Sequence, residues 1–164
     1  MRLEQLKHSA EQRFDIRIAA DGRWFHEGGV IRRMELIKLF ASALTLDGNG
    51  DYWLVTPVEK GRITVDETPF IISNMQIENA GNPARAKILF HTNLDDEVLL
   101  DLAHPLYLHS LGDAQDLRPY VDVRDGLAAK LSRPVYYELA GFAEQGPGDK
   151  LGVWSHQQFF MLEA

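Results

Sequence analysis

Apolar and polar residues alternate near the start of the chain in a way that predicts a strand hairpin. Phe14, Ile16 and Ile18 occupy every second position, and the pair Asp21-Gly22 follows them. Alternation turns one apolar face toward a core, and Asp-Gly between two such runs is a strong signal for a tight turn. The stretch FDIRIAADGRWFHEG is therefore predicted to be a strand, a turn and a second strand.

Two other stretches repeat their apolar residues at intervals of three and four, which predicts helices. The first covers residues 2–12 and would pack one narrow stripe on the rest of the chain. The second begins at Met34, has the strongest helical pattern in the sequence, and ends before the turn-forming letters LDGNGD. The repeated residues are Leu3, Leu6 and Ala10 in the first stretch, and Leu36, Ile37, Leu39, Phe40, Ala43 and Leu44 in the second.

The rest of the chain is dominated by short strand patterns. YWLVTPVEKGRITVDETPF predicts two strands joined near Glu59-Lys60-Gly61, with Pro57 at an edge or a bulge. After Pro69, the runs FIISNMQIEN, AKILFHT, EVLLD and LYLHS predict an antiparallel meander. PYVDVRDGLAAKLSRP is predicted to hold a short helix capped by Asp125, followed by strands in VYYELAGF and LGVWSHQQFFML around the loop at 146–148.

These elements predict an α+β fold of mostly antiparallel strands, in two similar small sheet-plus-helix motifs. The expected divisions are an N-terminal helix at 1–13, a first motif at 14–69, and a larger β-rich motif with one helix at 70–164.

An internal duplication is predicted from a match between the two halves. Placing Ile31-Arg32 on Val123-Arg124 aligns Leu39 with Leu131 without a gap, and an aromatic pair follows in each half. These aromatic pairs are Tyr52-Trp53 and Tyr136-Tyr137.

Composition narrows the possible functions. The chain has 164 residues, 45% of them hydrophobic and 25% charged, which is typical of a globular protein. Its formal net charge of −7 argues against broad nucleic-acid binding, which needs a basic face. The chain has no cysteine and no apolar run of the length that a signal peptide or membrane span requires. A cytoplasmic protein without membrane insertion is therefore expected.

A calcium loop is suggested by DGNGDYWLVTPVE but fails on two positions. Asp47, Asn49 and Asp51 stand at the first, third and fifth places. Tyr52 occupies the sixth place, which needs Gly, and Val58 occupies the twelfth, which needs a bidentate Glu. We interpret this segment as a plain loop from helix to strand.

Other catalytic patterns are also absent. The histidines lack metal-ligand spacing, no serine lies in a G-x-S-x-G elbow, and neither phosphate-binding glycine motif occurs. Pairs among the 24 acidic residues remain open, because some approach one another in any fold. We therefore predict no metal and no cofactor, and leave an enzyme of unidentified chemistry as a third alternative.

The stretch WFHEGGVIRRMELIKLFASAL suggests an anion site. Gly28-Gly29 would let a ligand approach the backbone, the following helix start offers free N–H groups, and Arg32 could pair a phosphate or carboxylate. The alternative is a glycine turn followed by two solvated arginines, since a charge against the helix dipole costs only about 0.3–1 kcal/mol. Arg124 before the second predicted helix repeats the pattern, although Asp125 would cap that helix.

The phrases DGRWFHEGGVIRR, LFASAL, YWLVTPVEKGRITVDETPF, TNLDD, AHPL and PYVDVRDGLAAKLSRPVYYELA occur in the order typical of one family. From about residue 14 the chain resembles the bacterial family called domain of unknown function 1285. The resemblance implies a duplicated sheet-plus-helix architecture, a C-terminal half loosely like a pleckstrin-homology fold, and a signalling role with a small ligand, without catalytic residues. The family's motif residues fall on Trp24, Arg32, Pro57, Glu59, Lys60, Asp66, Thr92, Asn93, His104, Pro105, Tyr120, Arg124, Arg133 and Tyr137.

The first functional hypothesis is a cytosolic module that holds a small anion, such as a nucleotide, between its two halves. An aromatic ring would stack on a base while basic side chains neutralise phosphate. The second is a protein-interaction adaptor that uses exposed strand edges, and a homo-oligomer is compatible with either. The predicted ligand-binding residues are Trp24, Arg32, Glu59, Lys60, Thr92, Asn93, His104, Tyr120, Arg124 and Arg133.

Overall fold

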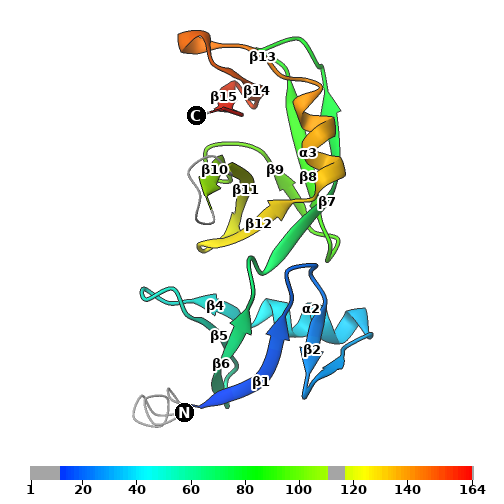
Figure 1. Ribbon diagram of the computed structural model, residues 1–164, viewed down its shortest axis with the longest axis vertical. Coiled ribbons are helices and arrows are strands. Elements are labelled where there is room, and N and C mark those ends of the chain that lie inside the picture. The colour runs from blue at the N-terminus through cyan, green and yellow to red at the C-terminus, as the bar shows by residue number, and fades with distance from the viewer. Residues whose placement is uncertain (1–11, 111–116, 164) are drawn as a thin grey trace. The chain divides into compact units, whose positions relative to one another are not determined.

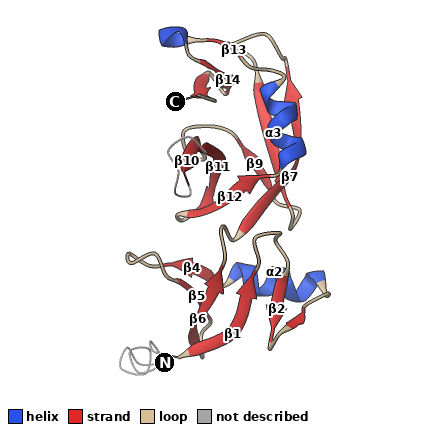
Figure 2. Ribbon diagram, in the orientation of Figure 1, coloured by secondary structure: helices blue, strands red, loops and turns tan. Residues whose placement is uncertain are grey.

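Two units make up the chain, Met1–Pro69 and Phe70–Ala164, and each is built around its own six-stranded sheet (Figure 1). The computed structural model describes residues 12–110 and 117–163. Strand rather than helix makes up most of both units (Figure 2), and the predicted α+β class is confirmed. The predicted N-terminal helix lies outside the described residues except at its end, where Arg13 already begins a strand.

The N-terminal unit contains one mixed sheet and one helix, α2 (Met34–Ser42). Its strands lie in the order β3-β2-β1-β6-β5-β4, and the central pair β1·β6 is parallel while the other neighbours are antiparallel. Trp24 is fully buried and stacks on Phe40 of α2, so the helix packs on the face of the sheet that carries Trp24. The strands are β1 (Arg13–Ile18), β2 (Trp24–His26), β3 (Gly29–Val30), β4 (Leu44–Leu46), β5 (Tyr52–Val55) and β6 (Lys60–Val65).

The C-terminal unit contains a second six-stranded sheet, the helix α3 (Arg133–Ala140) and a small three-stranded sheet. The large sheet has the order β10-β11-β12-β7-β8-β9, and the small one has the order β13-β14-β15. A 3₁₀ turn, η2 (Pro147–Asp149), lies between β13 and β14. The strands are β7 (Phe70–Glu78), β8 (Lys87–Thr92), β9 (Glu97–Leu99), β10 (Leu106–Ser110), β11 (Leu117–Arg124), β12 (Leu127–Leu131), β13 (Glu144–Gln145), β14 (Leu151–Ser155) and β15 (Gln158–Met161).

The two large sheets share one strand order. In each sheet, the first strand in the chain lies at the centre, and the next two lie successively closer to one edge. The fourth strand lies at the other edge, and the fifth and sixth lie successively closer to the centre. The first and last strands therefore pair, and they pair in parallel: β1 with β6 in one unit and β7 with β12 in the other. The helix differs in place, because α2 lies between β3 and β4 whereas α3 follows β12. Two similar sheet motifs are therefore present.

The residue match used to predict the duplication is wrong. Arg32 lies just before α2, whereas Arg124 ends the strand β11. Tyr52-Trp53 belongs to β5, whereas Tyr136-Tyr137 lies inside α3. The similarity is one of strand order and not of the aligned residues, because the helix is inserted at a different point in each unit.

The predicted helix capped by Asp125 does not form. Asp125 and Gly126 have φ of 49° and 79°, and they make the tight turn between the antiparallel strands β11 and β12. Both residues of a type I′ hairpin turn need positive φ, which Asp-Gly tolerates well. The same dipeptide signal that correctly predicted the turn at Asp21-Gly22 was thus misread as a helix cap here.

The segment VYYELAGF was predicted as a strand and is a helix. Val135 and Leu139 are its buried residues, four positions apart, and α3 begins with Arg133-Pro134. Proline is favoured in the first turn of a helix because its missing N–H has no partner to lose there. Tyrosine and valine favour strands only weakly, and the packing of α3 on β7 overrides that preference.

A smaller correction concerns the end of α2. The sequence pattern predicted that this helix extends to Leu44, but the helix ends at Ser42. Leu44 instead begins β4, where it pairs with Leu54 of β5. The DGNGD loop therefore joins two strands, β4 and β5, rather than a helix and a strand. Within the described residues, no helix is long and apolar enough to cross a membrane.

Candidate functional site

An apolar pocket of about 540 Å³ lies within the N-terminal unit. Its walls come from β1, from the last turn of α2, from the end of β5 and from the turn that follows β5. The lining residues are Phe14, Ile16, Leu39, Phe40, Ser42, Ala43, Leu54, Val55, Thr56, Pro57 and Glu59.

The absence of a side chain at Gly61 shapes one wall of the pocket. A Cβ placed on Gly61 in β6 would lie 2.4 Å from ring carbons of Phe14, so the aromatic ring of Phe14 rests directly on the β6 backbone. Phe14 lies in β1, which pairs in parallel with β6, and it lines the pocket. The pocket wall therefore depends on glycine at position 61.

A second wall is fixed by hydrogen bonds at the end of α2. The Val55 N–H donates to the carbonyl of Ala43 at 2.9 Å, which ties β5 to the residue that caps the helix. The Ser42 hydroxyl donates to the Leu39 carbonyl at 2.6 Å and so satisfies one of the free carbonyls of the last turn. Leu39 is left 63% exposed beside the pocket.

A four-residue turn, Thr56 to Glu59, forms the rim and joins β5 to β6. The Thr56 N–H donates to the Glu59 carbonyl at 2.8 Å, and the Thr56 Oγ1 accepts from the Glu59 N–H at 3.0 Å. Pro57 restricts φ within this turn. The turn therefore fixes the backbone of Glu59 beside the pocket.

Trp53 does not line the pocket, and two basic side chains pack on it. The Lys60 Nζ lies 4.5 Å and the Arg62 Cζ 4.7 Å from the centre of a Trp53 ring. The indole N–H donates to Asp47 Oδ2 at 2.8 Å, and this hydrogen bond, followed by one from the Asp51 backbone N–H, lowers the pKa of Asp47. The predicted site residue Lys60 thus packs on an aromatic ring rather than lining the pocket.

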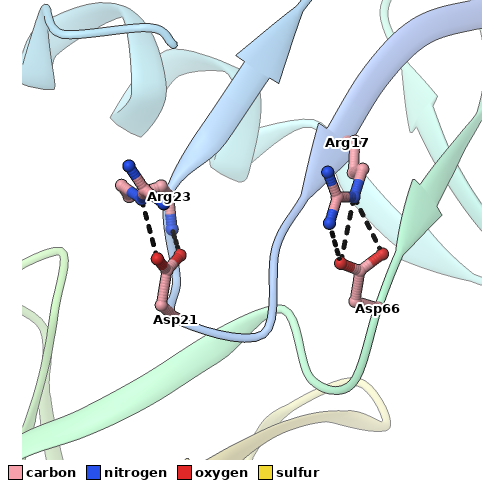
Figure 3. A network of polar contacts seen from close by, with 4 residues as sticks. All are labelled: Arg17, Asp21, Arg23 and Asp66. Atoms are coloured by element: carbon pink, nitrogen blue, oxygen red, sulfur yellow. Dashed lines mark hydrogen bonds and ion pairs between the residues drawn. The ribbon is translucent and has the colours of Figure 1, made fainter. Parts of the chain in front are cut away.

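Two ion pairs lie at one end of the strands β1, β2 and β6 (Figure 3). Arg17 Nε lies 3.0 Å from both carboxylate oxygens of Asp66, and Arg23 Nε lies 2.7 Å from Asp21 Oδ2. The hydrogen bond from Arg17 lowers the pKa of Asp66, and the hydrogen bond from the Arg23 backbone N–H lowers the pKa of Asp21. These arginines are therefore already paired and do not form a basic surface.

The two aromatic residues predicted to stack on a ligand are both buried. Trp24 is 0% exposed, and its indole N–H has no hydrogen-bond partner. Tyr120 is 4% exposed, stacks on Tyr107 at 5.9 Å between ring centres, and meets the His109 ring edge-on. Neither ring offers an open face to a base.

Three predicted polar residues hold turns of the C-terminal unit together. Thr92 Oγ1 accepts from the N–H groups of Leu94 and Asp96, and Asn93 Oδ1 accepts from the Ile71 N–H at 3.0 Å. The His104 Nδ1 lies 2.9 Å from Asp101 Oδ1, which also accepts from the His104 backbone N–H. In this structure their side chains stabilise loops.

The predicted arginines are exposed, and only two of the three stand near a helix start. Arg32 precedes α2, whose cap residue Arg33 makes no side-chain capping hydrogen bond, and Arg133 begins α3. Arg124 ends a strand, with its guanidinium 5.8 Å from the Phe70 ring centre. Gly28 does not cradle a ligand at a helix start, because it makes the tight turn between β2 and β3.

Of the ten predicted site residues, Glu59 is the one that lines the pocket. The sequence analysis missed the apolar walls, because Phe14 and Leu54 are expected in any core. One signal was present: Leu39 lies outside the buried face of α2, which is marked by Ile37 and Ala41. An apolar residue on the exposed side of an otherwise amphipathic helix indicates contact with something else.

The structure of residues 12–110 and 117–163 contains no candidate metal site. Within these ranges, no group of three or more His, Asp or Glu side chains is placed to hold a metal ion.

Two solved structures resemble the chain. One is a DUF1285 family protein from Silicibacter pomeroyi DSS-3, at 34% identity and a TM-score of 0.83, where the match covers 92% of this chain and 80% of that one. The other is a DUF1285 family protein from Shewanella baltica OS155, at 26% identity and a TM-score of 0.59, covering 79% of this chain and 92% of that one. None of the curated proteins matches.

Two family models match consecutive parts of the sequence. Residues 3–68 match the domain of unknown function DUF1285, N-terminal domain, and residues 69–162 match the protein of unknown function DUF1285, C-terminal domain. Their junction falls where the two structural units meet in the chain. With both models matched in order and a relative at 34% identity, the chain belongs to the DUF1285 family.

Proposed function

We propose that this protein is a small-molecule-binding module whose ligand site is the apolar pocket of the N-terminal unit. The observation that carries the proposal is the pocket itself. Its volume of about 540 Å³ falls within the range of roughly 300–1,000 Å³ typical of ligand sites, and most of its lining is apolar. Such a site binds chiefly by removing apolar surface from water.

The rim supports selective binding. Leu39 and Val55 are partly exposed beside the pocket, so a ligand would cover apolar surface that now faces solvent. Thr56, Ser42 and Glu59 supply a few polar groups around this surface. Many apolar walls with a small number of placed polar groups are the usual composition of a specific small-molecule site.

A regulatory role in the cytoplasm is part of the same proposal, with the ligand as the signal. The anionic ligand expected from the sequence would bind elsewhere, because no arginine or lysine lines the pocket. Its best support is the uncapped start of α2 beside Arg32, where N–H groups and a guanidinium lie close in sequence. Nucleotides therefore belong in the ligand screen as a separate arm, with Arg32→Ala and Arg124→Ala as variants.

The adaptor alternative has weaker support. Among the edge strands of the two large sheets, β3, β4 and β9 have two or three residues, and β10 in the C-terminal unit has five. Short edges limit the hydrogen bonds that an added strand can make.

The test is a titration with an apolar fluorescent dye that brightens in nonpolar surroundings. Saturable binding to the wild-type protein is expected, and Leu39→Asp should weaken it by about tenfold or more, since burying a leucine contributes about 1.5–3 kcal/mol. Leu102→Asp is the matched control, because Leu102 is also exposed, at 71%, and lies in the other unit. Equal binding by wild type and both variants would mean that the pocket is not the site.

A further inference from the structure

Glu59 is the one charged residue among those that line the pocket. The other lining residues are apolar or carry a hydroxyl group. A ligand that fills this pocket therefore meets apolar walls along most of its length and a carboxylate at one point of the rim. That arrangement selects for charge at one end of the ligand.

The turn that carries Glu59 fixes the backbone from which its carboxylate extends. Thr56 binds the Glu59 backbone through three hydrogen bonds: its N–H donates to the Glu59 carbonyl, its hydroxyl donates to the same oxygen at 3.2 Å, and its oxygen accepts the Glu59 N–H. Pro57 stiffens the same turn. A charge on a fixed frame loses less conformational entropy when it pairs than a charge on a free loop.

Lys60, the cation nearest to Glu59 in sequence, does not line the pocket. It is the next residue and begins β6, and its ammonium rests on Trp53 at 4.5 Å. Arg62 lies on the same ring. The basic side chains nearest in sequence are thus engaged on Trp53 and do not line the pocket.

We propose that the ligand is a hydrophobic amine, with an alkyl or aromatic body in the pocket and a protonated amine paired with Glu59. This inference rests on the proposed function and adds the chemical class of the ligand. A primary amine stays protonated at neutral pH, as a lysine side chain does. A carboxylate ligand in the same pocket would meet repulsion from Glu59.

The experiment compares octylamine, octanol and octanoate, which share one chain length and differ in the charge of the head group. Each probe competes against the apolar dye on the full-length protein at low salt. In wild type, octylamine should bind roughly three- to tenfold more tightly than octanol, as expected for one partly exposed charge pair, and octanoate should bind most weakly. The preference for the amine should shrink as salt is added.

Two variants test whether Glu59 causes the preference for octylamine over octanol. Glu59→Gln keeps the shape of the side chain and should remove the difference between octylamine and octanol. Glu35→Gln changes the net charge equally but lies in the first turn of α2, away from the pocket lining, and should keep the wild-type preference. Both positions are exposed, so neither change disturbs the core.

The outcomes separate this inference from the proposed function. If octylamine and octanol compete equally in wild type, or if the amine preference survives Glu59→Gln, the inference is wrong while the pocket remains a ligand site. If the dye binds in a Leu39-dependent way but none of the three probes displaces it, the inference is wrong; if the dye itself binds equally to wild type and Leu39→Asp, the proposed function fails. If octanoate binds best, the head group is anionic and the inference is overturned.

Discussion

Ser155 illustrates how one buried hydroxyl can join two sheets. It is 0% exposed, donates to the Leu100 carbonyl at 2.7 Å and accepts from the Ile88 N–H at 2.9 Å, linking the small sheet to the strand β8 and to the residue after β9. Ser155→Ala would leave both backbone groups buried without a partner. We expect a loss of about 1–3 kcal/mol in unfolding free energy, measured by urea denaturation.

The control for this prediction is Ser73→Ala. Ser73 is exposed and its hydroxyl lies 3.5 Å from the His91 carbonyl, so its removal should change stability by no more than about 0.5 kcal/mol. Equal effects of the two substitutions would contradict the role assigned to Ser155.

Gly61 offers a test of the pocket wall at the same scale. In Gly61→Ala, the new methyl group would meet the Phe14 ring at 2.4 Å, so the ring must move. We expect destabilisation of about 1–3 kcal/mol from overpacking, together with weaker dye binding because Phe14 lines the pocket. Gly48→Ala is the control, since nothing lies within 4 Å of a Cβ there and its φ is not positive. Unchanged stability and dye binding in Gly61→Ala would show that Phe14 has free space to move.

At the scale of elements, acidic side chains at the ends of strands make the N-terminal unit sensitive to acid. Hydrogen bonds lower the pKa of Asp47, through the Trp53 indole, and of Asp66, through Arg17. A carboxylate with a lowered folded-state pKa binds fewer protons when folded than when unfolded, so stability rises with pH in this range. The stabilisation is present above the unfolded value of about 3.9 and is lost as pH falls through the lower folded values.

We therefore expect the urea midpoint to fall as the pH is lowered from about 5 to about 2. Asp47→Asn should flatten this dependence, because the amide does not titrate, and it should also lower stability at every pH, because its single oxygen cannot accept both from Trp53 and from the Asn49 and Asp51 N–H groups. Fluorescence-detected urea unfolding at a series of pH values gives the slope for each protein. A wild-type slope retained in Asp47→Asn would exclude Asp47 as a source of the acid sensitivity.

The elements also show which local signals were sufficient. The alternation of Phe14, Ile16 and Ile18 correctly predicted β1, because an alternating run that long is seldom anything but a strand. The helix at Val135 to Leu139 was missed, since only two of its residues are buried and its tyrosines favour strands. Short elements of this kind are decided by tertiary packing, which no local pattern records.

At the scale of the whole molecule, the pocket could not be predicted from the sequence, because its walls come from segments that lie far apart in the chain. Its walls join residues as far apart as Phe14 and Glu59, and the contact of Phe14 with Gly61 depends on the parallel pairing of β1 with β6. A parallel pair of strands far apart in sequence leaves no turn signal between them. Glu59 was found through the resemblance alone, and its place in the pocket came from the fold.

The pairing of strands predicts that the chain can be divided after Pro69. Every strand of the C-terminal unit finds its neighbours within that unit, and β7 lies at the centre of its sheet between β12 and β8. A fragment of residues 70–164 therefore keeps all its strand partners and a core that includes Phe70, Phe90 and Leu139, and we expect it to unfold cooperatively in urea when followed by circular dichroism. The matched control is a fragment of residues 87–164, which lacks β7; it should not fold, because β12 and β8 then lose the strand that joins them. If the longer fragment also fails to unfold cooperatively, contacts with the first 69 residues are required for its stability, and the two units form one folding unit.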